Sequence, residues 1–161
     1  MKLKSLLLLP LMFLSISTFS QGDKSIPQDD TNIIIDYPDN VKAPLTKNEK
    51  ALIDEVYQSK AQTLVYDDAK YLKDVKHLLR NRITIYEDGN PKTQKKGMML
   101  SDIPLFDSYN KDLKRDENFN VENFNPLKYQ LDFFAKGTYV YRVDNTNYFI
   151  QVTSQYRKIK K

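Results

Sequence analysis

Apolar residues recur every three or four positions in residues 46–80, the spacing that places them on one face of an α-helix. Thr46, with Glu49 three positions later, forms a capping box that starts the first helix. The apolar stripe of this helix continues to about residue 65. Asp67 is placed to cap a second helix. The pattern therefore predicts two amphipathic helices in the N-terminal half of the chain.

After residue 81 the period changes to two, which is typical of strands with one buried face. Ile83 and Ile85 begin this alternation, and a turn sequence follows at residues 88–91. The strongest alternation lies in residues 128–152, where short turns separate three apolar faces, namely Tyr129, Leu131 and Phe133, then Tyr139, Tyr141 and Val143, and then Tyr148, Ile150 and Val152. This stretch predicts a C-terminal β-meander.

A run of helices followed by a run of strands is typical of an α+β fold. We expect the two helices to pack on one face of a small antiparallel sheet, with residues 46–156 forming a single domain. Residues 92–126 show no regular period, so we expect an irregular excursion held by isolated apolar anchors. These anchors are Met98, Met99, Leu100, Ile103, Leu105, Phe106, Phe119 and Phe124.

The N-terminus shows a third pattern. Lys2 and Lys4 precede an apolar run, Leu6 to Leu14, and small residues close the segment before Gln21. The run is too short to span a bilayer, and its three parts are typical of a secretory signal peptide. We therefore predict that residues 1–20 are a signal peptide and that the protein is exported, to the periplasm or to the medium.

Both flanks of the predicted domain are polar. Residues 21–45 are rich in Asp and Pro, so we interpret them as a flexible lead-in. The triplet Ile33-Ile34-Ile35 is the exception, and the alternative is that it pairs as an edge strand. Residues 157–161 are predicted to be a frayed basic tail. After the signal peptide, no apolar run is long enough for a membrane-spanning helix.

Composition excludes several classes of protein. The chain has no cysteine, which rules out a disulfide framework, a thiol nucleophile and a thiolate metal site. Its net charge of +4 falls to +2 when Lys2 and Lys4 are removed with the signal peptide, and a chain so near neutrality is not a dedicated polyanion binder. We therefore expect no nucleic-acid partner.

Candidate catalytic chemistry is sparse. His77 is the only histidine, and we predict that it lies on the solvated face of the second helix because its helical neighbours are polar, namely Lys73, Asp74, Arg80 and Asn81. No phosphate-binding glycine loop, nucleophile elbow or metal-binding motif is present. We predict no catalytic residue, no metal site and no cofactor. An enzymatic function stays open only for carboxylate chemistry, which needs just two acids across a cleft.

The C-terminal part carries a family resemblance. The sequence FNPLKY at residues 124–129 leads into the predicted meander, and YRVDNTNY at residues 141–148 forms its last hairpin. This part resembles small uncharacterised secreted proteins of the Bacteroidota. The resemblance implies an envelope or released protein, which agrees with the predicted signal peptide. It implies no activity and no site residues.

These exclusions favour a secreted or periplasmic, non-enzymatic interaction module. Its partner would be an unidentified envelope or extracellular protein, or a glycan. Tyrosines beside positive charge can stack on rings and bind polar groups. We therefore expect the binding surface on the excursion and on the second face of the sheet, with the candidate residues Lys111, Lys114, Arg115, Tyr139, Tyr141 and Tyr148.

Two alternatives remain open at this point. The first is a carboxylate-dependent hydrolase that acts on cell-wall or polysaccharide substrates. A pocket with two converging acids would favour the hydrolase, whereas a shallow aromatic or charged surface would favour the interaction module. The second is a partner that inhibits a toxin, which would need a compact protruding loop.

Overall fold

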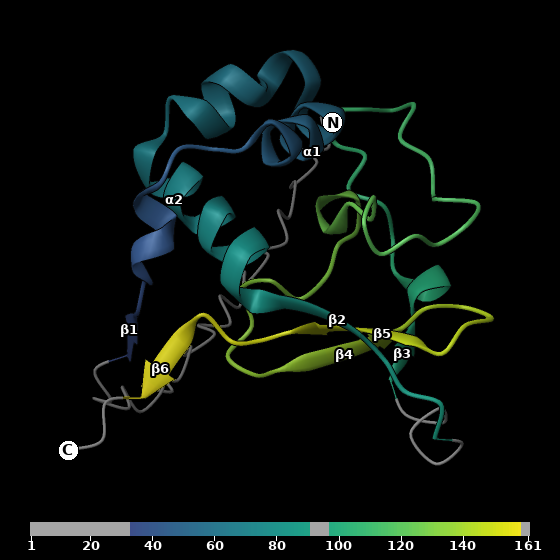
Figure 1. The fold of residues 1–161 in the computed structure, drawn as a ribbon. Helices are drawn as coiled ribbons and strands as arrows, with labels where there is room; N and C mark the ends of the chain where they lie inside the picture. The colour runs from purple at the N-terminus through teal and green to yellow at the C-terminus, as the bar shows by residue number, and fades with distance from the viewer. Residues whose placement is uncertain (1–32, 91–96, 159–161) are drawn as a thin grey trace, which may run out of the picture. The chain divides into compact units, whose positions relative to one another are not determined.

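The computed structural model contains two α-helices and a four-stranded sheet, joined by short 3₁₀ and π-helical turns and by irregular segments (Figure 1). The structure describes residues 33–90 and 97–158, which belong to one compact unit, Thr31–Lys161. The helices are α1 (Lys47–Tyr57) and α2 (Ala69–His77). This arrangement confirms the predicted α+β class. The predicted signal peptide, residues 1–20, and the basic residues Lys92, Lys95 and Lys96 lie outside the described residues.

Helix α1 begins as predicted and ends earlier than predicted. The Thr46 hydroxyl accepts a hydrogen bond from the Glu49 N–H at 3.1 Å, and the Glu49 carboxylate accepts one from the Thr46 N–H at 2.8 Å. The predicted continuation to residue 65 is wrong, because Gln58 adopts a positive φ of 46° and interrupts the helix. A 3₁₀ turn and a π-helical turn follow, and they still direct Ala61 and Val65 into the core.

Helix α2 begins one residue later than predicted. Asp68, not Asp67, accepts a hydrogen bond from the Tyr71 N–H, at 2.9 Å. The helix passes into a π-helical turn, Leu78–Arg82, which leads directly into the first strand of the main sheet. Such turns change which side chains face inward, and they are frequent at functional sites. Here both Leu78 and Arg82 are buried.

The main sheet has the order β2-β5-β4-β3. Its strands are β2 (Ile83–Glu87), β3 (Met98–Met99), β4 (Tyr139–Arg142) and β5 (Tyr148–Val152). Strand β5 pairs antiparallel with both β2 and β4, whereas β3 pairs parallel with β4. The sheet is therefore mixed, and the prediction of a wholly antiparallel sheet is wrong.

The first strand of the predicted meander does not exist. Tyr129 forms a single bridge with Leu105, and the rest of residues 129–133 is irregular. The Lys128 carbonyl accepts a hydrogen bond from the Phe106 N–H at 2.7 Å, so this backbone bonds to the excursion instead of to a neighbouring strand. Apolar and polar residues alternate in this part of the sequence because Tyr129 and Leu131 are buried while Gln130 is exposed. Strand β3 lies beside β4, in the place that the first strand of the predicted meander would have taken.

The described part of the excursion, residues 97–126, is mostly irregular after β3 and is held largely by the predicted anchors. Leu100, Ile103 and Phe124 are buried, whereas Met98 is 49% exposed. Leu113, which was not among the predicted anchors, is also buried. The Asn110 side chain donates a hydrogen bond to the Glu55 carbonyl at 2.8 Å and so ties the excursion to α1.

Part of the predicted lead-in packs onto the domain. The isoleucine triplet forms β1 (Ile33–Ile35), which pairs with β6 (Tyr156–Lys158) and thereby draws the start of the predicted basic tail into a strand. Val41 is 1% exposed. The Arg80 guanidinium bonds to the Glu49 carboxylate at 2.5 and 2.7 Å and also donates to carbonyls of the lead-in, those of Asn40, Ala43 and Pro44.

The core consists of two buried clusters. One includes the inward faces of the helices, with Ile53, Val56, Val65, Val75 and Leu78 at its centre. The other lies on the sheet, with Tyr141, Ile150 and Val152 at its centre. Ile83, Leu105 and Phe133 pack against both clusters. Residues 126–133 therefore lie where the helical and sheet layers meet.

Gly97, just before β3, supports a testable prediction about the sheet edge. Its φ is +100°, and a Cβ atom there would lie 3.1 Å from the Val140 carbonyl oxygen. Gly97→Ala should therefore lower the free energy of unfolding by roughly 1–2 kcal/mol. Gly89→Ala is the matched control, since a Cβ atom there would meet nothing within 4 Å. Urea unfolding measures both, and equal stabilities of the two variants would contradict this account.

Candidate functional site

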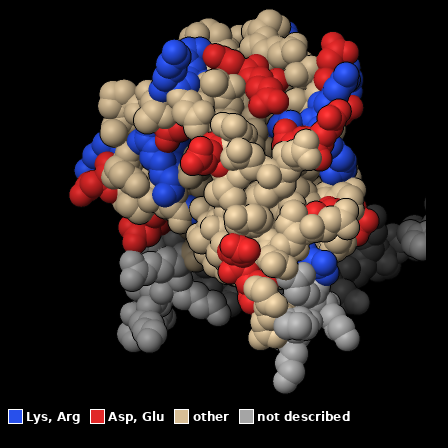
Figure 2. Space-filling model, turned by 45° about the vertical axis from the view of Figure 1, so that its right-hand side comes forward, with Lys and Arg blue, Asp and Glu red and all other residues tan. Residues whose placement is uncertain are grey.

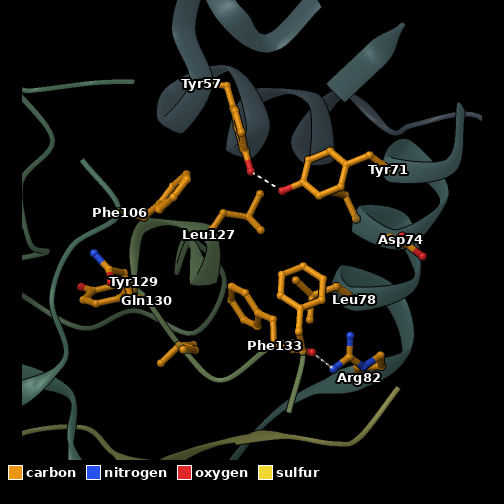
Figure 3. A pocket seen from close by; sticks show the side chains of 13 residues that line it. Tyr57, Tyr71, Asp74, Leu78, Arg82, Phe106, Leu127, Tyr129, Gln130 and Phe133 are labelled. Atoms are coloured by element: carbon orange, nitrogen blue, oxygen red, sulfur yellow. Dashed lines mark hydrogen bonds between the residues drawn. The ribbon is translucent and has the colours of Figure 1, made fainter. Parts of the chain in front are cut away.

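An apolar cavity of about 180 Å³ lies between α2, the end of α1 and residues 127–134 (Figure 3). We call it the aromatic pocket, and its inner wall consists of Tyr57, Tyr71, Leu78, Arg82, Leu127 and Phe133. Gln130 and Phe134 also line the pocket and are exposed, Phe134 by 59%. The cavity is therefore open to solvent along residues 130–134.

A pair of tyrosine hydroxyls forms part of the wall of the aromatic pocket. The Tyr57 and Tyr71 oxygens lie 2.6 Å apart, and Tyr57 is 5% exposed. Burial, followed by the hydrogen bond with Tyr71, raises the pKa of Tyr57 far above its usual range. Each hydroxyl has one proton, and the pair uses one of the two internally. Within residues 33–90 and 97–158 the pair has no further hydrogen-bond partner, so one O–H donor remains.

Arg82 is the charged group that lines the inner wall. The residue is 3% exposed, and its guanidinium donates to the Thr153 carbonyl at 3.0 Å and to the Phe133 carbonyl. No carboxylate of the described residues lies within 4.0 Å of it, although buried charges in proteins are usually paired. Burial lowers the pKa of Arg82, and the charge of Asp74 opposes this shift only in part.

The Asp74 carboxylate belongs to the same lining but points away from the cavity in Figure 3. One of its oxygens accepts a hydrogen bond from the Tyr37 hydroxyl. The other lies 2.8 Å from the Lys70 ammonium group. Both oxygens are therefore bound, and Asp74 does not form an ion pair with Arg82.

His77 lies behind this site, and the prediction that it is a surface histidine is wrong. It is 7% exposed, its ring centroid lies 5.3 Å from that of Tyr37, and its Nδ1 lies 3.3 Å from the Asn81 side-chain nitrogen. The reason is that the packed lead-in, through Tyr37, covers the polar face of α2. Burial, followed by the charge of Arg82, lowers the pKa of His77, while Asp74 and Asp36 oppose the shift.

A second cavity, of about 280 Å³, contains acidic side chains. We call it the acidic pocket, and it is lined by Ser101, Arg115, Asp116, Glu117, Tyr129 and Asp144 among others. Asp144 accepts hydrogen bonds from the Ser101 N–H and hydroxyl at 2.9 and 2.6 Å. Burial opposes ionisation of Asp144, but these bonds outweigh it and lower its pKa. Asp116 lies 2.6 Å from the ammonium group of Lys128, which is 4% exposed.

The six predicted binding residues do not form one surface. Tyr141 is 1% exposed, and its hydroxyl donates to the Asp132 carboxylate at 2.8 Å, so it is a core residue. Tyr148 is half-buried against Phe119, and Tyr139 is 37% exposed. Strand alternation directs these tyrosines to the same side of the sheet as the buried Ile150 and Val152.

The predicted basic residues are exposed, but one of them has a structural role. Lys111 lies 3.6 Å from Asp107, and Lys114 is exposed. Arg115 donates to the Leu100 and Ile103 carbonyls and is the one of the six that lines either of the two pockets. On the face shown in Figure 2, Lys and Arg side chains are interspersed with Asp and Glu around a broad uncharged area. This face does not present a large area of one charge.

Sequence reasoning missed the inner wall of the aromatic pocket. Tyr71 and Leu78 belong to the apolar pattern of residues 46–80, and Phe133 lies in a predicted strand. Their apolar character could therefore be predicted, but not that the three side chains line one cavity. Arg82 carried no signal, because an arginine between a helix and a strand is usually solvated. Its burial follows from the π-helical turn.

His77 supports a prediction about pH. Because its pKa is lower in the folded protein than in the unfolded chain, where it is about 6.5, the unfolded chain binds the proton first as the pH falls. Stability should therefore fall from about pH 7 to about pH 5.5, by no more than about 1.4 kcal/mol per pH unit. In His77→Gln, which removes the only histidine, this fall should disappear. Denaturant unfolding at both pH values measures it, and an equal fall in both proteins would contradict the prediction.

Comparison with known proteins adds no template for the fold or the site: no protein-family model, no curated protein and no solved structure matches this chain. Within the described ranges, no group of three His, Cys, Asp or Glu side chains is placed to hold a metal ion. In the same part of the chain, none of the helices has the length and apolar character needed to cross a membrane. The two pockets are therefore the candidate functional sites of the described residues.

Proposed function

We propose that this chain is an exported, non-enzymatic binding module and that the aromatic pocket is its binding site. The observation that carries the proposal is a cavity of about 180 Å³ walled by aromatic and aliphatic side chains, with a hydroxyl pair and a guanidinium as its inward polar groups. Ligand pockets in proteins have this composition, mostly apolar with a few placed polar groups.

The size of the cavity restricts what it can hold. An apolar cavity of about 150 Å³ stays dry in a protein core and binds a molecule the size of benzene. The aromatic pocket is slightly larger and open on one side, so it accommodates one ring with a short substituent. Aromatic walls favour a planar guest, since offset and edge-to-face ring contacts add to the burial of apolar area.

The acidic pocket gives the hydrolase alternative its best location, but two of its three acids, Asp116 and Asp144, are engaged in other ways. A glycosidase needs one carboxyl group with a raised pKa. The pKa of Asp144 is lowered, and Asp116 pairs at 2.6 Å with the buried Lys128, which also lies 3.5 Å from Glu55. These contacts favour structural roles for both acids, so we propose the binding module.

Export is part of the proposal and rests on the N-terminal pattern, Lys2 and Lys4 followed by the apolar run Leu6–Leu14. The protein isolated from its own organism should begin at Gln21 and should be found in the envelope fraction or the medium. N-terminal sequencing after cell fractionation measures both. A cytoplasmic protein that begins at Met1 would contradict export.

The proposed site predicts that the purified protein binds indole. The chain has no Trp, so indole fluorescence can be excited apart from that of tyrosine and shifts to shorter wavelength when indole enters the pocket. Val75→Phe places a ring in the cavity and should weaken binding at least about tenfold, a free-energy loss of about 1.4 kcal/mol. Leu79→Phe, in the π-helical turn that follows α2 and outside the lining, is the matched control and should bind like the wild type.

Thermal unfolding of both variants checks that each is folded, because overpacking a core costs about 1–3 kcal/mol. A second measurement does not depend on either variant: nuclear Overhauser contacts should join indole to the Leu127 methyl groups in the wild-type protein. Absence of indole binding to the wild-type protein, or contacts elsewhere only, would overturn the proposal.

A further inference from the structure

We infer that the aromatic pocket binds a small aromatic carboxylate, with its ring between Leu127 and Phe133 and its carboxylate on the Arg82 guanidinium. This inference rests on the proposed function and names the chemical class of the ligand. It follows from the placement of one charged side chain in an otherwise apolar cavity.

The charge state of Arg82 is the first step. A guanidinium has five N–H donors and stays protonated in proteins. Two of these donors have acceptors in the structure, the Thr153 and Phe133 carbonyls, and no other acceptor is present among the described residues. Carbonyl groups orient the guanidinium, but they do not neutralise it. A cation that is almost entirely buried and has no carboxylate beside it is costly, and a carboxylate in the cavity would reduce that cost.

The charges around Arg82 are the second step. Asp74 is the carboxylate in the pocket lining, and its two oxygens are bound by Tyr37 and Lys70. His77 contributes little positive charge near neutral pH because its pKa is lowered. The positive charge that faces the cavity is therefore that of Arg82, which favours an anionic guest over a neutral one.

The geometry of the cavity is the third step. In Figure 3 Arg82 lies at one end of the group of labelled side chains and the hydroxyls of Tyr57 and Tyr71 lie at the other, with Leu127, Leu78 and Phe133 between them. A guest with one apolar ring and one terminal anionic group matches this sequence of surfaces. A long chain or a polyanion does not match a cavity of about 180 Å³.

The same chemistry occurs in two sources, a free arylalkyl acid and the C-terminus of a peptide that ends in Phe. Phenylacetate presents the ring and the carboxylate without a peptide chain, whereas the peptide acetyl-Ala-Ala-Phe presents them at the end of one. The amides of both are neutral and nearly identical in shape. Comparison of the two acids distinguishes the sources, and comparison of each acid with its own amide tests the inference.

The experiment is isothermal titration of the purified wild-type protein with these four compounds near pH 7 at low salt. We expect at least one acid to bind about tenfold or more tightly than its amide, because a charged hydrogen bond to a desolvated guanidinium is lost in the amide. We also expect this acid to displace indole. Equal affinities of acid and amide for both pairs, or tighter binding of the amides, would overturn the inference.

A variant pair assigns the preference to Arg82. Arg82→Gln keeps a donor for the backbone carbonyls but removes the charge. The affinity of the acid divided by that of its amide should therefore fall to about one, as expected when a charge-assisted contact is lost. Arg115→Gln is the matched control, because Arg115 also donates to two backbone carbonyls but lines the acidic pocket. A preference that persists in Arg82→Gln, or disappears in Arg115→Gln, would contradict the assignment. The comparison of wild-type affinities stands even where Arg82→Gln fails to fold.

The outcomes separate this inference from the proposed function. If indole binds in the pocket and both acids bind no better than their amides, the binding site stands and the carboxylate inference fails. If neither indole nor any of the four compounds binds, both fail.

Discussion

The buried Arg82 guanidinium is the interaction on which the arrangement of this protein depends. It follows α2, it donates to the Phe133 carbonyl in the irregular segment, and it donates to the Thr153 carbonyl just after β5. One side chain thus holds together a helix end, a loop and the end of a central strand. The same side chain lines the aromatic pocket, so the cavity lies beside this contact of three segments.

This arrangement explains why a cavity occurs at the contact between two layers. Phe133 packs against both the helical cluster and the sheet cluster, and the aromatic pocket lies beside it. Residues 126–133 bond to the excursion through their backbone instead of pairing as a strand. Leu127 belongs to the helical cluster, Tyr129 and Leu131 belong to the sheet cluster and Phe133 packs against both, so the side chains toward the helices are irregularly spaced. Irregular spacing leaves space that a regular strand would fill. The irregular segment 126–133 therefore both connects the two layers of the fold and forms part of the wall of the candidate site.

The parts of the fold that depend on local chemistry could be predicted from the sequence. The capping box of Thr46 and Glu49, strand β2 and the last hairpin follow from short-range patterns. The pairing of β3 with β4, the burial of His77 and the role of the segment 129–133 could not be predicted, because each depends on which distant segment covers which face. The candidate site depends on such contacts throughout. Arg82 in particular is a polar residue in the sequence and a buried one in the fold.

The most direct test is a crystal structure of the protein grown with whichever acid binds more tightly, phenylacetate or acetyl-Ala-Ala-Phe. The phenyl ring should lie in the aromatic pocket beside Leu127, with the carboxylate within hydrogen-bond distance of the terminal nitrogens of Arg82 and both carbonyl contacts of Arg82 retained. A ligand bound elsewhere, or one that enters the pocket with its carboxylate directed to solvent, would contradict this prediction.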